Sequence, residues 1–417
     1  MLAEIIAVGS ELLTPYRQDT NSLYLTAGLN ELGVTVAFKT IVGDQRENLT
    51  SSVEAALNRA DIVILSGGLG PTEDDLTREC VAQALQLPLE PDQLLLDELQ
   101  QRFASRNLQM TENNCRQADH IHGSTILPNR NGSAPGQWIE ITFNGSRKLV
   151  ALLPGPPGEL QPIFDSECKP RLAAALSPNH LARRQLRMTL LAESQVDARC
   201  APIYKTFPDV QTTILAGNAE IQLHFSCVKP TLAEAEARVE AVADAVSREM
   251  GDDVFSSNGE PLEEVVLLML GVRHQTLAVA ESCTGGLIGQ RLTSIPNSSR
   301  VFLGGAIAYS NRSKTALADV PSYLIDEHGA VSEAVARALA EGIRRRVGSS
   351  LALSITGIAG PGAPRGRDAQ KPVGLVYLAL TDGKETQVHE ITLRGSRDRI
   401  RLWAAQHALE MLRRHLL

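Results

Sequence analysis

Short apolar runs that end in glycine-rich or polar turns, separated by stretches with helical spacing, constrain the fold of this chain more than any other feature. Residues 3–9 and 34–43 are strand-like, residues 20–32 and 47–60 have helical spacing, and residues 61–75 run from a strand into the turn SGGLGPTEDD. Strands that alternate with helices favour a parallel sheet with ligands at the carboxyl ends of the strands. We therefore predict an α/β domain of three layers over residues 1–170.

The pattern changes near Arg171. A strand, a helix, a hairpin that turns at Gly217-Asn218, and a strongly amphipathic helix are expected at residues 184–194, 195–207, 211–228 and 231–250. These elements predict a small α+β module over residues 171–257. Since the module contains no catalytic constellation, we interpret it as a spacer or a dimerisation element.

The alternation of strands and helices returns in the last part of the chain, which we assign to a second α/β domain over residues 258–417. Strands are expected at residues 276–282, 304–310 and 351–357, with one helix starting at Thr284 and further helices up to Arg346. A loop rich in glycine and proline, two more strands and a final helix complete the domain.

Composition narrows the classes of function. A length of 417 residues favours two or three domains, and a formal net charge of -8 argues against binding to nucleic acid mainly through phosphate contacts. The six cysteines have no CxxC or metal-ligand spacing, so we expect a reducing cytoplasm. No secretory signal and no long apolar segment is evident, so we expect no membrane association.

Ser282 lies in the segment LAVAESCTGGLIG, directly after an apolar run and before an expected helix. Backbone N–H groups at the start of a helix have no partner within the helix and can bind the oxyanion that forms when a carbonyl is attacked. Gly285 and Gly286 would let the backbone approach a ligand closely. Ser282 is therefore a candidate nucleophile, and an ordinary helix N-cap is the alternative.

A nucleophilic serine needs a base, and no histidine lies in a comparable motif. The segment AYSNRSKT, at another expected strand end, contains Tyr309, Asn311 and Lys314. A lysine can act as the base only if burial or a neighbouring positive charge lowers its pKa by several units. A solvated lysine at the start of a helix is the alternative interpretation.

Two further segments suit the binding of a phosphorylated small molecule. Thr356 and Gly357 end an expected strand and lead into a glycine-rich loop whose amides could line a pocket. Arginines at positions 394, 397 and 399 surround the start of the last helix, where phosphate binding is favoured, although a solvated cluster fits equally well.

The motifs AESCTGG, AYSNxxK, GIAGP and KPVG together resemble the PncC-like nicotinamide-nucleotide amidase domain of the CinA (competence/damage-inducible protein A) family. The resemblance implies that Ser282 and Lys314 form a Ser–Lys dyad, with Tyr309 beside it, that hydrolyses nicotinamide mononucleotide to nicotinate mononucleotide and ammonia without a metal. It also implies a set of substrate-binding residues: Cys283, Thr284, Gly285, Asn311, Thr356, Gly357 and Arg397. The loop from Pro361 to Lys371 is longer than in compact relatives and adds Arg365 and Arg367.

The turn SGGLGPTEDD is the most informative motif of the first domain. Its glycines, Gly67, Gly68 and Gly70, can present several amides to a phosphate. Asp74 and Asp75 follow near an expected helix start, where they could cap the helix or hold a divalent ion that bridges a pyrophosphate.

The N-terminal segments VGSELL, DTN, VGD, SGGLGPTEDD, NGSAPG and LLPGPPGEL resemble the molybdopterin-binding-like domain of the same family. The resemblance implies a metal-dependent ADP-ribose pyrophosphatase activity, with Asp74 and Asp75 at a divalent metal ion. Asn21 and Asp44 would line the pocket, and Gly67, Gly68 and Gly70 would bind phosphate. Relatives often form homodimers, so a homodimer is expected.

Three functions remain open from the sequence. The first is a bifunctional enzyme that recycles fragments of NAD by hydrolysing nicotinamide mononucleotide and ADP-ribose. The second is an amidase whose N-terminal domain only binds a nucleotide or a pterin. The third is an interaction protein associated with competence and recombination, a reading that loss of Ser282 or Lys314 would have favoured; both residues are present.

Overall fold

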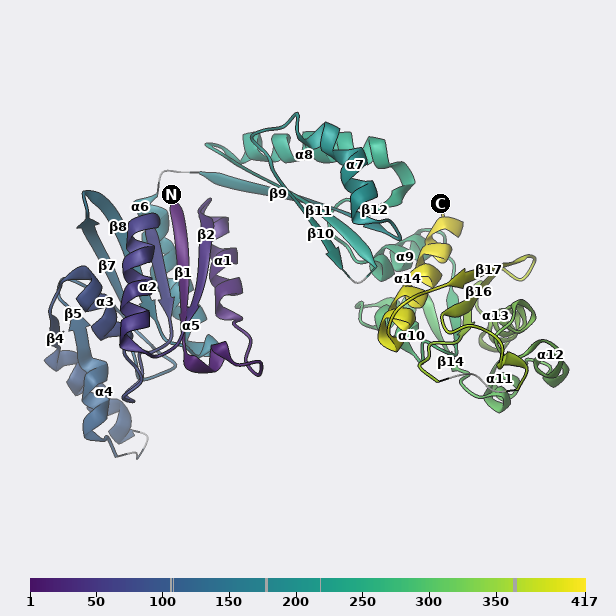
Figure 1. Ribbon diagram of the computed structural model, residues 1–417, viewed down its shortest axis with the longest axis horizontal. Helices are drawn as coiled ribbons and strands as arrows, with labels where there is room; N and C mark the ends of the chain where they lie inside the picture. Colours follow the sequence, from purple (N-terminus) through teal and green to yellow (C-terminus); the bar gives the residue numbers. More distant parts are fainter. Residues whose placement is uncertain (106, 108, 177–178, 218, 363–365) are drawn as a thin grey trace. The chain divides into compact units, whose positions relative to one another are not determined.

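The computed structural model describes residues 1–105, 107, 109–176, 179–217, 219–362 and 366–417, which form two compact units (Figure 1). The first unit contains Met1–Ala182 and Val228–Ala235, and the second contains Arg183–Cys227 and Glu236–Leu417. Most of the small module expected over residues 171–257 therefore packs in one unit with the C-terminal part of the chain. The boundaries at residues 170 and 257 stay predictions.

A six-stranded sheet organises the first unit, with the strand order β2-β1-β3-β8-β7-β6. The four strands from β2 to β8 are parallel as expected, whereas β7 runs antiparallel to β8 and β6. A two-residue turn at Asn144 and Gly145, both with positive φ, joins β7 to β8 as a hairpin. The strands are β1 (Leu2–Val8), β2 (Thr35–Val42), β3 (Ile62–Ser66), β6 (Thr125–Leu127), β7 (Gly136–Phe143) and β8 (Ser146–Leu153).

Helices cover both faces of this sheet, which makes the three layers that the sequence predicts. Ile5 and Ile64 belong to a core cluster with α1 (Asn21–Glu31), α5 (Pro157–Ile163) and α6 (Lys169–Ala175). Ile6 and Leu65, one position further along their strands, belong to a second cluster with α2 (Arg46–Arg59) and α3 (Thr77–Leu85). This alternation follows from the period of two in a strand. Helix α4 (Gln93–Ser105) and the short pair β4 (Leu89–Pro91) and β5 (Asp119–Ile121) complete the unit.

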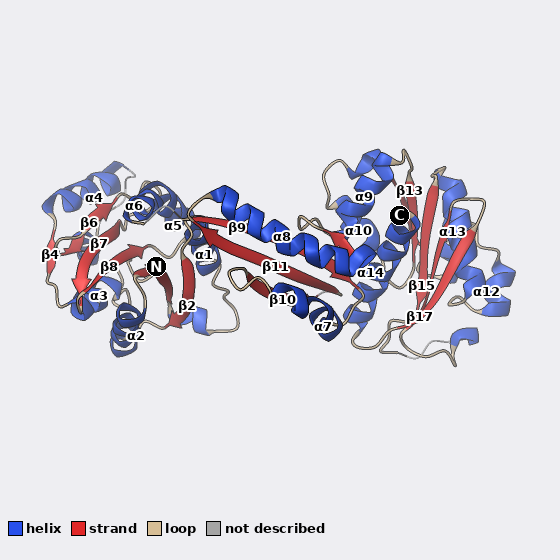
Figure 2. Cartoon of the chain, turned by 90° about the horizontal axis from the view of Figure 1, so that it is seen from above, coloured by secondary structure: helices blue, strands red, loops and turns tan. Residues whose placement is uncertain are grey.

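The small module has a four-stranded sheet with the order β10-β11-β9-β12. Figure 2 labels three of these strands, β9, β10 and β11. The expected hairpin is present, because β10 (Gln211–Gly217) pairs antiparallel with β11 (Glu220–Lys229), but Asn218 in the expected turn lies outside the described residues. The other elements are β9 (His180–Thr189), α7 (Glu193–Tyr204), α8 (Leu232–Met250) and β12 (Val254–Ser256). Strand β12 was not expected, since three residues are too few to show a period of two.

The C-terminal part of the second unit is built on a five-stranded sheet with the order β14-β13-β15-β16-β17. Strands β14, β13 and β15 are parallel, and β16 and β17 are antiparallel additions. The strands are β13 (Leu277–Glu281), β14 (Phe302–Ile307), β15 (Leu351–Gly357), β16 (Leu375–Thr381) and β17 (Thr386–Thr392). One face packs against α9 (Leu262–Val272), α10 (Leu287–Thr293) and α14 (Arg397–His415), and the other against α11 (Asn311–Ala318), α12 (Ser322–His328) and α13 (Glu333–Val347).

One boundary in this domain differs from the sequence expectation. The helix that was expected to start at Thr284 starts at Leu287, because Gly285 and Gly286 have φ values of 61° and 95°. A right-handed helix cannot contain residues in this conformation, so residues 283–286 form a turn instead. Among the described residues, no helix combines the length and the apolar character that crossing a bilayer requires.

Candidate functional site

Two adjacent parallel strands bring Ser282 and Lys314 together. Strands β13 and β14 pair so that Glu281 lies opposite Ile307, and the N–H of Ala308 donates to the carbonyl of Glu281 at 2.7 Å. Ser282 is the first residue after β13, and α11 starts three residues after Ala308. Since neighbouring parallel strands end at the same edge of a sheet, the first turn of α11 presents Lys314 to Ser282.

The amine of Lys314 lies 2.9 Å from the hydroxyl of Ser282 and 2.8 Å from the carbonyl oxygen of Ala308. Lys314 is 1% exposed, and in the described part of the chain it forms no ion pair with a carboxylate. Burial disfavours the charged form, which lowers the pKa of Lys314 to about 8. About a tenth of this amine is therefore neutral at pH 7, and only the neutral form can act as a base for Ser282.

The sequence predicts that backbone amides at the start of the helix after Ser282 bind the oxyanion. In the structure, the side chain of Glu281 binds amides at this helix start. Its carboxylate is 2% exposed and accepts hydrogen bonds from the backbone amides of Gly286, Ile288 and Gly289, at 2.9, 3.1 and 2.8 Å. Two amides in the first turn of α10, those of Ile288 and Gly289, are thus already paired. Within the described residues, the amides of Cys283 and Thr284 donate to no backbone carbonyl, so the turn after Ser282 offers donors that a ligand oxygen could use.

Tyr309 and Arg397 form a pair beside the dyad. The guanidinium of Arg397 donates to the hydroxyl of Tyr309 at 2.9 Å and to the carbonyl of Gly360 at 2.6 Å. Tyr309 is 61% exposed and follows Ala308, whose carbonyl accepts a bond from Lys314. Asn311 is also exposed, as the first residue of α11. The exposed guanidinium of Arg397 at the start of α14 suits a phosphate contact.

The other residues expected at this site shape its walls. Gly357 adjoins Cys283, because a Cβ at position 357 would lie 3.1 Å from the sulfur of Cys283. The hydroxyl of Thr356, a predicted substrate-binding residue, donates to the carbonyl of Ala330 at 2.8 Å. The carbonyl of Thr284 accepts a bond from Arg401 at 2.8 Å, which ties the turn to α14. Burial raises the pKa of Cys283 to about 12, so this thiol is not a competing nucleophile.

The extended loop after Gly360 is fixed at its far end. Arg365 lies outside the described residues, and Arg367 donates to the carbonyl of Asp326 at 3.1 Å. The amine of Lys371 contacts the carboxylate of Asp368 and the carbonyls of His328 and Val331, each at 2.7 Å. Asp368 in turn accepts from the amide of Ala330 at 2.9 Å, so this part of the loop is tied to the connection between α12 and α13.

A second candidate site lies in the first unit, in a cavity of about 320 Å³ at the carboxyl ends of β1, β3 and β8. Six of the residues expected here line the cavity: Asp44, Gly67, Gly68, Gly70, Asp74 and Asp75. Asn21 does not line the cavity itself. Its side-chain amide donates to the carbonyl of Gly155, which is a lining residue. Sequence reasoning missed two further carboxylates in the lining, those of Glu11 and Glu159.

Two residues at the start of helix α3 donate hydrogen bonds to the carbonyl groups of the glycine-rich turn. Thr77 donates from its hydroxyl to Gly67 and from its amide to Gly68, and Arg78 donates to Leu69 and Gly70, at 2.7 to 3.1 Å. Because N–H and C=O point in opposite directions in a peptide group, this leaves the amides of residues 68–70 turned away from α3. Arg78 is 1% exposed, so a buried positive charge lies beneath these amides. The turn is therefore suited to an anion.

Asp74 and Asp75 lie before α3, not in its first turn, since the helix starts at Thr77. One oxygen of Asp75 accepts from the amide and the hydroxyl of Thr72, at 2.9 and 2.5 Å, so it caps the turn at residues 72–75. Among the described residues, no three side chains of His, Cys, Asp or Glu gather as ligands for one ion. Mg²⁺ commonly takes one or two carboxylates, with water and substrate phosphate as its remaining ligands, and this donor set fits that mode.

Comparisons with known proteins match the two ends of the chain to two different families. Residues 4–174 match the family described as probable molybdopterin binding domain, and residues 259–416 match the CinA C-terminal domain. The chain is 56% identical over 417 residues to a CinA-like protein of Acidobacterium capsulatum, with 100% of both chains covered. It is 42% identical over 422 residues to a CinA-like protein of Myxococcus xanthus, covering 100% of this chain and 99% of the relative. A crystal structure of the competence/damage inducible protein CihA from Agrobacterium tumefaciens covers 37% of this chain and 92% of its own, at 37% identity and a TM-score of 0.35.

Proposed function

The chain belongs to the CinA family, and from this premise we propose that its C-terminal domain hydrolyses the carboxamide of nicotinamide mononucleotide. The observation that carries the proposal is the contact of 2.9 Å between the buried amine of Lys314 and the hydroxyl of Ser282. A buried lysine with no carboxylate partner lowers the stability of the fold, because burial disfavours its charge. A role as the base for the adjacent hydroxyl of Ser282 accounts for a lysine at this position.

In the proposed reaction, the oxygen of Ser282 attacks the carboxamide carbon while its proton moves to the amine of Lys314. The tetrahedral oxyanion binds at the amides of Cys283 and Thr284, which donate to no backbone carbonyl, and its collapse breaks the C–N bond. The leaving nitrogen takes the proton from Lys314 and departs as ammonia, which leaves a nicotinoyl ester on Ser282. Lys314 then removes a proton from water, whose oxygen attacks the ester carbon. As the bond from that carbon to the oxygen of Ser282 breaks, Lys314 returns the proton to Ser282 and nicotinate mononucleotide is released. No metal takes part in this scheme.

Glu281 has a positioning role in this scheme. By accepting from the amides of Gly286, Ile288 and Gly289, its carboxylate fixes the turn at residues 283–286 that contains the amides of Cys283 and Thr284. Arg397 is proposed as the contact for the substrate phosphate, oriented by its bonds to Tyr309 and Gly360. Asn311 and Gly357 would border the bound nicotinamide.

The pKa of about 8 for Lys314 predicts how the amidase responds to pH. Since the neutral amine is the active form, kcat/KM should rise with pH and level off above the pKa; one unit below it, about a tenth of the enzyme is active. The measurement is kcat/KM for nicotinamide mononucleotide between about pH 6 and pH 9.5. A profile that is flat or falls over this range would contradict the assignment of Lys314 as the base.

For the N-terminal domain, we propose a metal-dependent hydrolysis of the pyrophosphate of ADP-ribose. The observation that favours it is that one cavity is lined both by the glycine-rich turn and by several carboxylates. The carbonyls of this turn bind the buried Arg78, which leaves its amides turned away from Arg78. Asp74 and Asp75 would hold the divalent ion, which when bound polarises a phosphoryl oxygen. The amides of residues 68–70 would hold one phosphate group.

Replacement of Asp75 by alanine is expected to lower AMP formation from ADP-ribose by about 100-fold, with a weaker apparent affinity for the divalent ion. Glu73→Ala is the matched control, because Glu73 is an exposed neighbouring carboxylate that does not line the cavity. AMP formation that survives a chelator would contradict the role of the metal. Binding of ADP-ribose without hydrolysis would favour an N-terminal domain that only binds nucleotides.

A further inference from the structure

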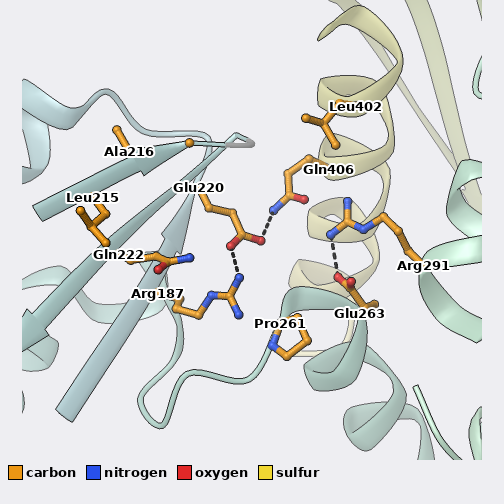
Figure 3. A pocket seen from close by; sticks show the side chains of 11 residues that line it. Arg187, Leu215, Ala216, Glu220, Gln222, Pro261, Glu263, Arg291, Leu402 and Gln406 are labelled. Atoms are coloured by element: carbon orange, nitrogen blue, oxygen red, sulfur yellow. Dashed lines mark hydrogen bonds and ion pairs between the residues drawn. The ribbon is translucent and has the colours of Figure 1, made fainter. Parts of the chain in front are cut away.

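A second cavity in the second unit, of about 330 Å³, is not used by the proposed chemistry (Figure 3). Its walls come from β9, β10 and β11 of the small module and from α9, α10 and α14 of the C-terminal sheet domain. Neither the dyad nor the turn at residues 283–286 lines it. The cavity is therefore a separate place for a small molecule.

Two arginine–glutamate pairs line this cavity. Arg187 pairs with Glu220, and these side chains are 14% and 7% exposed. Arg291 pairs with Glu263 at 2.7 Å, and these are 12% and 14% exposed. Figure 3 shows Gln406 of α14 reaching toward Glu220, to which its side-chain nitrogen donates at 3.1 Å. The charges of the lining sum to zero.

Three buried polar atoms of the lining have no hydrogen-bond partner among the described residues. They are Nε of Arg187, Nη1 of Arg291 and the side-chain oxygen of Gln406. Gln406 is 1% exposed, and its nitrogen is already shared between Glu220 and Thr189, at 3.1 and 2.8 Å. Buried polar groups are nearly always paired, so these two donors and one acceptor call for a ligand with complementary groups.

The chemistry of the three atoms defines that ligand. The free donors belong to two guanidinium groups, which favour a carboxylate because charge-assisted hydrogen bonds are the strong ones. The free acceptor is the side-chain oxygen of Gln406, and the same lining contains the carboxylates of Glu220 and Glu263. These oxygens favour an ammonium. A simple anion would be repelled by Glu220 and Glu263, and a simple cation by the two arginines.

We propose that this cavity binds a small zwitterion of the α-amino acid class. The carboxylate of the ligand lies at the free guanidinium N–H groups of Arg187 and Arg291, and its ammonium lies at the oxygen of Gln406. Since the lining belongs to both the small module and the C-terminal sheet domain, bound ligand stabilises the packing of these two parts against each other.

The first test changes the ligand and leaves the protein intact. Isothermal titration of the full-length protein with L-alanine, L-serine and L-glutamine should show saturable binding of at least one of them below about 10 mM. The N-acetyl and the carboxamide derivatives of that amino acid each lack one charge and should bind at least about tenfold more weakly. Absence of saturable binding would show that water alone fills the cavity and would overturn the proposal, as would equal binding of a derivative or preferential binding of neutral nicotinamide.

The second test places the binding in this cavity. Arg291→Gln should weaken binding of the amino acid by about tenfold or more, since it removes a charged donor. Arg300→Gln is the matched control, because Arg300 is an exposed arginine outside the lining and should leave binding unchanged. Equal affinity in Arg291→Gln and wild type would overturn the assignment of the site. If Arg291→Gln does not fold, Gln406→Leu and the ligand series above decide the question.

Discussion

Replacement of Ser282 by alanine is expected to lower the release of ammonia from nicotinamide mononucleotide by at least about a thousandfold, because it removes the proposed nucleophile. The hydroxyl of Ser282 contacts Lys314 at 2.9 Å, so the variant loses one hydrogen bond and creates little empty space. The fold should therefore persist. The measurement is steady-state ammonia release, with circular dichroism to confirm the fold.

Ser294→Ala is the matched control for this variant. Ser294 is an exposed serine just after α10, and its hydroxyl donates only to the carbonyl of Arg291 at 2.6 Å. Its replacement should leave the rate within about twofold of wild type. Equal rates for Ser282→Ala and Ser294→Ala would show that the hydroxyl of Ser282 does not take part in the reaction.

Replacement of Lys314 by methionine is expected to lower the same rate by about 10³-fold or more, while the folded protein stays at least as stable. Methionine has a similar length but no amine, so it cannot accept the proton of Ser282. The structure buries Lys314 to 1% exposure, and the low pKa reports the cost of that burial. Removal of the buried amine should therefore raise the free energy of unfolding, and loss of the hydrogen bonds to Ser282 and Ala308 offsets part of this increase.

This combination of lost activity and retained stability separates a catalytic base from a structural lysine. Thermal unfolding of Lys314→Met should show a Tm equal to or above that of wild type, whereas loss of a structural ion pair would lower it. The residual activity of the variant should also lack the rise of kcat/KM with pH. A variant that keeps the wild-type rate would remove Lys314 from the mechanism.

The layers of the fold follow from local sequence patterns. In β1, Ile5 and Ile6 face opposite cores, as the period of two predicts, and the same alternation recurs at Ile64 and Leu65 in β3. The antiparallel direction of β7, β16 and β17 was not predicted, because it depends on which edge of the sheet each strand joins. A local pattern does not contain that information.

The candidate sites show the same division between local and tertiary information. Ser282 and Lys314 were paired only through the resemblance of AESCTGG and AYSNxxK to a known family. The fold gives the physical reason for their contact, since neighbouring parallel strands end at one edge. Glu281 was missed, although a carboxylate just before a helix start is a signal for capping. Arg78 was missed because a charged side chain in a helix is usually exposed, and only the folded turn shows the carbonyls of Leu69 and Gly70 that it contacts.

The most direct test of the account is a titration of the amine of Lys314 itself. The carbon-13 signal of the side-chain carbon next to the amine can be followed with pH in protein with labelled lysine, and it is assigned by its absence in Lys314→Met. The account predicts that this signal titrates with a pKa of about 8. Titration near the ordinary lysine value of about 10.4 would contradict the central claim, since the amine would then be an ammonium when it meets Ser282.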